Sequence, residues 1–168
     1  MLATQPIATK LAGLVLLNAY LPMYFEKAGL TRELAFIGEA QRHRAAFLLQ
    51  YAASGIAQAE CDSPLAKVLA GLAPTDSSSS PEPLAAEEHE LTAHLLSAVI
   101  SHCPALGNTS IGGFQGNFLL RDGRLLLGEN TSTLTVQRKA YDILLDRTPL
   151  SFNTVYARWM PRPLYVTW

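Results

Sequence analysis

The chain has 168 residues, of which 49% are hydrophobic and only 16% are charged, and its formal net charge is −1. The longest basic run, Gln137-Arg138-Lys139, is too short to attract a phosphate backbone, so the composition argues against nucleic-acid binding. The length favours a single domain, 1–168, with a substantial hydrophobic core. Because typical domains carry about 25% charged residues, the deficit indicates a surface covered by another protein or a polar, uncharged shell.

The cysteines and the apolar stretch near the N-terminus bear on localisation. Cys61 and Cys103 lie far apart and in no motif, which predicts buried thiols in a reducing compartment and gives no support for a disulfide. The stretch Leu11 to Leu17 is too short to span a bilayer, and no signal-peptidase site follows it. We expect a buried helix there, no membrane insertion and a cytoplasmic protein.

In the first half of the chain the patterns predict helices. Residues 8–28 predict an apolar helix that breaks near Tyr20, because Pro22 lies inside it. A second helix is predicted over 33–54 and ends at Gly55. Ser63 followed by Pro64 predicts the start of a short helix over 65–70.

A low-complexity segment, residues 74–83, separates these helices from the next and predicts a flexible surface loop. A long helix over 84–103 follows, with acidic residues near its N-terminus and Pro104 at its end. Ser110 provides another helix-capping residue, so a helix over 111–120 is predicted despite its glycines.

The pattern then changes to strands. Residues 124–127 and 131–137 predict two strands joined by a turn at 128–130, and 152–156 and 164–168 predict two more after a short helix at 141–146. Helices first and strands last indicate an α+β fold. We expect a helical body of about five helices over residues 8–121, followed by a strand-rich part, 122–168, that forms a small antiparallel sheet.

No set of residues with catalytic or metal-binding spacing stands out. His89 and His94 are five residues apart, about 140° around a helix, whereas a zinc-protease helix needs histidines four apart on one face. The glycine-rich segment Gly107 to Gly116 fits neither the phosphate-loop nor the dinucleotide pattern and favours helix packing or a turn. We therefore expect no enzyme, no cofactor and no metal. A small hydrolase or ligand-binding domain that uses the 89–102 helix and this segment remains the alternative.

Aromatic side chains concentrate near the C-terminus, where both tryptophans lie. A chain that ends on Trp is expected to hold that side chain in a core or against a partner. Core packing accounts for most such aromatic residues, and protein binding is the functional interpretation because interfaces favour Trp and Tyr. The residues predicted to form a protein-binding region are Tyr156, Trp159, Met160, Tyr165 and Trp168.

Six ordered segments together resemble one known family. They read LAGLVLLNAYLPMYFEKAGL, RAAFLLQYAASG, LAKVLAGLAP, NTSIGGFQGNFLLRDGRL, KAYDILLDRTPLS and RWMPRPLYVTW. From about residue 7 to the end, the chain resembles the conserved domain of contractile injection system tape-measure proteins, which belong to phage-tail-like particles.

The resemblance implies a structural role in assembling the inner tube, with tube, spike or baseplate proteins as partners and no catalytic residues. Family members are usually several times longer, and even a fully helical chain of this length would reach only about 250 Å. The resemblance therefore favours an adaptor, initiator or cap, or a fragment of a longer protein. A homo-oligomer is an open possibility, and a cargo adaptor or chaperone for a secreted effector is the alternative function.

Overall fold

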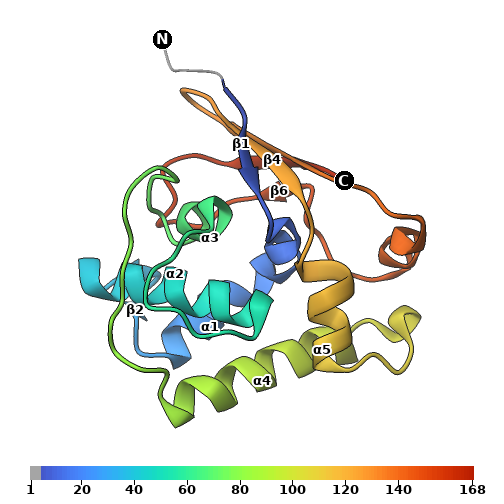
Figure 1. Ribbon diagram of the computed structural model, residues 1–168, viewed down its shortest axis with the longest axis horizontal. Helices are drawn as coiled ribbons and strands as arrows, with labels where there is room; N and C mark the ends of the chain where they lie inside the picture. The colour runs from blue at the N-terminus through green and yellow to red at the C-terminus, as the bar shows by residue number, and fades with distance from the viewer. Residues whose placement is uncertain (1–4) are drawn as a thin grey trace.

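The computed structural model describes residues 5–168 and has an α+β fold, in which helices pack beneath a twisted sheet (Figure 1). The sheet contains β1 (Ile7–Thr9), β4 (Gly123–Leu127), β5 (Ser132–Val136), β6 (Thr154–Val155) and β7 (Leu164–Thr167). The α-helices are α1 (Leu21–Lys27), α2 (Glu39–Ser54), α3 (Pro64–Leu69), α4 (Ala86–Ser101) and α5 (Ile111–Phe114). The 3-10 helices are η1 (Ala12–Tyr20), η2 (Pro104–Leu106) and η4 (Ala140–Arg147), and η3 (Gln115–Leu119) is a π-helix. The predicted fold class is confirmed.

The sheet has the strand order β1-β4-β5-β7-β6 and is mixed, so the prediction of an antiparallel sheet is wrong. β7 lies between β5 and β6 and runs parallel to β5, with Leu134 opposite Val166. β6 pairs antiparallel with β7, with Val155 opposite Leu164. The reason is the long connection through η4, which lets the chain return to the sheet in the direction of β5 rather than as a simple hairpin.

The sheet also reaches back to the N-terminal end of the chain. Residues 7–9, whose last two positions were predicted to be helical, instead form the edge strand β1, in which Ile7 pairs with Leu125 and Thr9 with Gly123. The helical region begins only at η1. Its predicted break is confirmed, because η1 ends at Tyr20 and α1 begins at the next residue with Pro22 in its first turn.

The predicted helix over 33–54 begins later than expected. A small hairpin, β2 (Thr31–Arg32) and β3 (Ala35–Phe36), occupies its first residues. Glu33 and Leu34 form the turn with positive φ angles of 52° and 64°, as a two-residue hairpin requires. The remaining prediction is confirmed, because α2 ends at Ser54 and Gly55 follows in the left-handed conformation.

Local capping signals placed the other helices correctly. The Ser63 hydroxyl accepts a hydrogen bond from the Ala66 amide at the start of α3, and the Ser110 hydroxyl accepts one from the Gly113 amide at the start of α5. Helix α4 ends just before Pro104, and β4 and β5 form the predicted hairpin.

The core lies between the inner face of the sheet and the helices. Leu125, Leu134 and Leu164 on three neighbouring strands are fully buried and face η1 and the helices below. The backbone of η1 approaches that of η3 closely at Gly13, where an added Cβ atom would overlap the Phe118 carbonyl oxygen. Glycine is therefore required for η1 to pack against η3. Within residues 5–168, no helix is long and apolar enough to cross a membrane.

Candidate protein-binding surfaces

The C-terminal Trp168 is held inside the chain, as predicted for a terminal tryptophan. Its indole Nε1 donates a hydrogen bond of 2.8 Å to Asp142 Oδ2, and its ring packs on Phe152 with centroids 5.3 Å apart. The side chain is only half-buried, so one edge stays in contact with solvent. The terminus is thus fixed by a specific contact rather than by general burial.

Trp168 joins a buried ion pair between Arg121 and Asp142. Arg121 follows η3 and Asp142 lies in η4, and neither side chain is exposed to solvent. The two Arg121 amino groups bind the two carboxylate oxygens at 2.5 and 2.8 Å, and the Lys139 amide donates to the same carboxylate. Burial alone would raise the pKa of Asp142, but these hydrogen bonds outweigh it and lower the pKa below its ordinary value. The arrangement is a structural network that pairs both amino groups of Arg121, whereas its buried Nε has no hydrogen-bond partner among the described residues.

Two of the five predicted binding residues, Trp159 and Met160, lie in the core. Trp159 is 8% exposed and Met160 is 3% exposed. The Trp159 indole donates to the Leu69 carbonyl oxygen at 2.8 Å, and its ring contacts those of Phe25 and Phe36 at 5.6 and 5.4 Å. In this fold their side chains stabilise the domain and are not available at the surface.

Tyr156 and Tyr165, in contrast, are 58% and 46% exposed. Tyr165 lies on the side of the sheet that faces away from the helices, because side chains alternate between the two faces of a strand. Eight side chains alternate outward in this way, and we call them the outer sheet face: Ala8, Arg124, Leu126, Thr133, Thr135, Thr154, Tyr165 and Thr167. Of the five predicted residues, the structure thus places Tyr165 in a larger surface and Tyr156 just after its edge strand β6.

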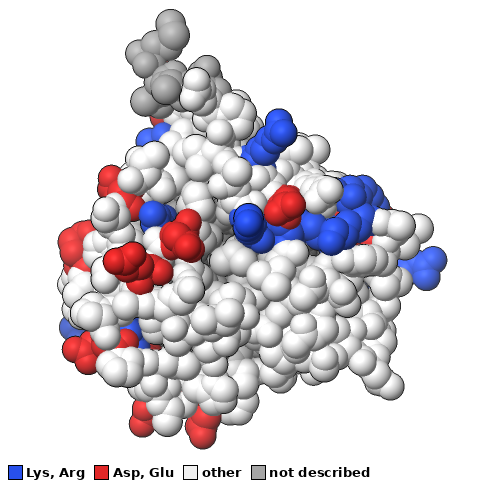
Figure 2. Space-filling model, viewed as in Figure 1, with Lys and Arg blue, Asp and Glu red and all other residues white. Residues whose placement is uncertain are grey.

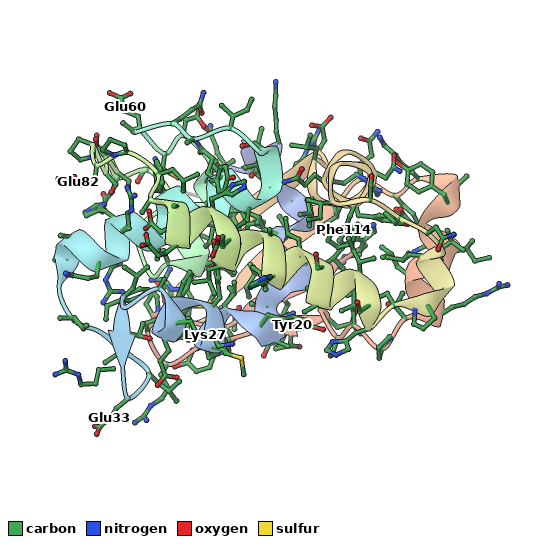
Figure 3. All side chains as sticks on the ribbon, turned by 90° about the horizontal axis from the view of Figure 1, so that it is seen from below. Tyr20, Lys27, Glu33, Glu60, Glu82 and Phe114 are labelled. Carbon is green, nitrogen blue, oxygen red and sulfur yellow. The ribbon has the colours of Figure 1, made fainter. Side chains whose placement is uncertain are left out.

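A groove that was not predicted from the sequence runs between α1 and α4. This α1–α4 groove has a volume of about 440 Å³ and is lined mainly by Ala19, Tyr20, Met23, Leu91 and Leu95. Tyr20 and Lys27 lie beside α4 in the view from below (Figure 3). In Figure 2 the surface over α4 and α5 is largely free of charged side chains, which shows where part of the low charge content is located. Met23, 61% exposed, contributes a large apolar side chain to this groove.

Two histidines on or just after α4 are hydrogen-bonded to tyrosine hydroxyls. His89 is hydrogen-bonded to the Tyr51 hydroxyl at 2.6 Å and His102 to the Tyr20 hydroxyl at 2.5 Å, whereas His94 lines the α1–α4 groove. Across the described part of the chain, no three His, Cys, Asp or Glu side chains come close enough to hold a metal ion. This arrangement offers no support for the hydrolase alternative.

The glycine-rich segment is largely helical. It forms α5 and η3, and the Gln115 amide binds the Ala52 carbonyl oxygen of α2 at 2.9 Å. Phe114 is fully buried and packs against Phe118, with ring centroids 5.9 Å apart. Close helix contact at these glycines is not seen, because among the described residues an added Cβ atom at Gly107, Gly112 or Gly116 would lie in open space. Gly107, with a φ angle of 69°, agrees instead with the predicted turn.

The comparisons with known proteins identify the class of protein. A family model described as contractile injection system tape measure protein matches residues 3–168. The chain therefore belongs to the contractile injection system tape measure protein family, a structural family, and the resemblance based on six segments is confirmed. No curated protein sequence and no solved structure matches the chain.

Proposed function

We propose that this chain is a non-enzymatic assembly component of a contractile injection particle, made in the cytoplasm, that binds tube, spike or baseplate proteins through its outer sheet face. The family membership supports a structural role in the particle. The outer sheet face supports the location of the contact, because the helices cover only the opposite side of the sheet (Figure 1).

The observation that carries the proposal is the composition of that face. Only Arg124 among its eight residues is charged, and the strand register aligns them in two rows. One row contains Leu126, Thr133, Tyr165 and Thr154, and the other contains Ala8, Arg124, Thr135 and Thr167. Tyrosine supplies large contact area at interfaces, and threonine hydroxyls can bond a partner without the cost of desolvating a charge.

The proposal is tested by co-purifying the full chain with the tube, spike and baseplate proteins of its particle. Tyr165→Ser should weaken the complex at least about tenfold, the range expected for a central aromatic contact. Met23→Ser in the α1–α4 groove is the matched control, because it also replaces an exposed apolar side chain and should leave binding unchanged. Equal loss in both variants, or no loss in either, would contradict the assignment to the sheet. Binding to an effector protein alone would instead favour the cargo-adaptor function, and unchanged particle assembly after gene deletion would count against both.

A further inference from the structure

The sheet ends at β1 in an edge that is open to a partner strand. Within residues 5–168, β1 is hydrogen-bonded to β4 on one side and to no strand on the other. On that free side a groove of about 390 Å³ separates β1 from the end of α2 and the start of α3. Its lining includes Ala8, Thr9, Gln50, Ser54 and Pro64. Figure 1 shows β1 at the margin of the sheet, with α3 on its outer side.

The hydrogen-bond pattern determines which backbone groups face the groove. Gln137 N–H donates to the Asp122 carbonyl oxygen, and Gly128 N–H donates to the Thr131 carbonyl oxygen. Successive residues of a strand point their backbone groups to opposite sides, so the even-numbered residues of β4 bond to β5 and the odd-numbered ones bond to β1. Ile7 and Thr9 therefore use their backbone groups against β4. Ala8, between them, directs its N–H and C=O toward the groove.

A buried hydroxyl in the same groove has no partner. Thr9 is 3% exposed, and among the described residues nothing forms a hydrogen bond with its Oγ1. Leaving a buried polar group unpaired is costly, and nearly all such groups in folded proteins are paired. The neighbouring Gln50 amide is, by contrast, fully used, since it donates to Gln58 and accepts from the amides of Asp62 and Ser63. Of the buried side-chain N and O atoms that line the groove, Thr9 Oγ1 alone lacks a hydrogen-bond partner among the described residues.

We propose that the β1 edge receives an extended segment of another injection-particle protein, which adds to the sheet as a further strand and pairs with the Thr9 hydroxyl. This inference rests on the proposed function and adds the site and form of the partner. A strand of three or four residues, roughly 10 to 13 Å long, matches β1. The segment would exchange hydrogen bonds with Ala8. Exposed Lys10 and Asp62 carry opposite charges in the groove lining, so an uncharged segment fits best. Strand addition of this kind takes its affinity from backbone hydrogen bonds.

Ala8→Pro is the decisive variant, and Ser77→Pro is its control. Proline at Ala8 removes only the N–H that faces the groove, so the fold should survive while binding falls at least about tenfold. Ser77 is exposed in the loop 74–83, outside both the outer sheet face and the groove, and its N–H forms no backbone hydrogen bond with any described residue. Proline at Ser77 should therefore leave both fold and binding intact.

Two further measurements separate the outcomes, again with co-purified tube, spike and baseplate proteins. Thr9→Val keeps the shape but removes the hydroxyl, so it should weaken the complex about two- to tenfold without lowering the melting temperature of the free chain. Hydrogen exchange of the peptide containing Ala8 should slow in the complex. Intact binding by Ala8→Pro with unchanged exchange would overturn the inference while leaving the proposed function standing. Failure of the wild-type chain to co-purify would refute both the inference and the proposed function. Protection of Ala8 from hydrogen exchange that rises with the concentration of the chain alone would identify a second copy as the occupant and overturn the inference.

Discussion

Arg121 and Asp142 form a two-point ion pair from which solvent is fully excluded, and the C-terminal Trp168 binds the same carboxylate. The pair joins the end of η3 to η4, two segments that are separated by the β4–β5 hairpin. Because η4 and Trp168 flank the last two strands, this contact fixes the C-terminal part of the chain to the helical body. The outer sheet face depends on it, since β7 carries Tyr165.

Asp142→Asn should destabilise the domain by about 3–5 kcal/mol at pH 7, because it leaves the Arg121 charge buried without a counter-charge. The effect should depend on pH. The pKa of Asp142 is lowered in the folded state, so its stabilisation is present above the ordinary pKa of an aspartate, about 3.9, and is lost as the pH falls toward the folded-state value. Urea unfolding of both proteins from pH 7 to pH 2.5 measures this.

The difference between wild type and Asp142→Asn should shrink as the pH falls below about 4, because a protonated Asp142 resembles asparagine. Asp146→Asn is the control, since Asp146 pairs with Arg138 at the surface and should contribute about 1 kcal/mol or less. A difference that stays constant across the pH range would show that Asp142 acts through its shape rather than its charge.

Trp159 and Tyr156 lie three residues apart but differ in burial, and their alanine variants should separate core packing from surface function. Trp159→Ala should cost about 3–5 kcal/mol, because it empties a pocket shared with Phe25 and Phe36 and frees the Leu69 carbonyl oxygen. Tyr156→Ala should change the free energy of unfolding by no more than about 0.5 kcal/mol. Guanidinium unfolding followed by circular dichroism compares them, and equal costs would contradict the burial described for Trp159.

Gly13→Ala should prevent stable folding, because the new methyl group would collide with the backbone of η3 at Phe118. We expect a loss of more than about 4 kcal/mol, at the upper end of single-substitution effects. Gly112→Ala is the control, since among the described residues the added methyl group would meet no atom within 4 Å beyond its chain neighbours and the backbone of its own helix. Alanine also favours the helix α5 by about 0.5–1 kcal/mol. Expression and melting temperature report both, and a Gly13→Ala protein as stable as wild type would refute the close contact.

The sequence predicted those features that depend on neighbouring residues. The caps at Ser63 and Ser110 and the β4–β5 hairpin involve signals only a few residues apart, so they could be identified without the rest of the chain. The strand β1 could not, because three residues carry too little periodicity and their partners lie more than a hundred residues away. The parallel pairing of β5 with β7 was missed for another reason, because alternation along a strand indicates its buried face but not its partner or its direction.

The candidate surface was predictable only in part. Alternation along 164–167 places Tyr165 outside and Leu164 and Val166 inside, a period of two that the sequence contains. Trp159 lies in an irregular segment, where no period indicates which side chains are buried. Arg121 could not be recognised either, since a lone arginine in a sequence is expected at the surface until its distant carboxylate is known.

The segment 74–83, predicted to be a flexible loop, is hydrogen-bonded to α2 in the structure, and a single residue provides most of these bonds. The Arg44 guanidinium donates to the Ser80 hydroxyl at 3.1 Å and to the carbonyl oxygens of Glu82 and Pro83 at 2.7 and 2.9 Å. It also binds Glu88 of α4 through both carboxylate oxygens. Arg44→Met removes these hydrogen bonds but keeps a long apolar side chain at this position of α2, so it should release the segment 74–83.

We therefore expect proteinase K to cleave residues 74–83 at least about tenfold faster in Arg44→Met than in wild type. Proteolysis requires the segment to open locally, and the variant lowers the free energy of this opening. Arg32→Met is the control, since it removes an exposed arginine from the β2–β3 hairpin and should not change the rate. Mass spectrometry of the early fragments locates the cuts. Rapid cleavage within 74–83 in all three proteins would show that this loop is flexible despite Arg44, as its composition predicts. Slow cleavage in Arg44→Met would mean that the backbone hydrogen bonds of Ser78 and Ser80 to residues 59–61 hold the loop in place without Arg44.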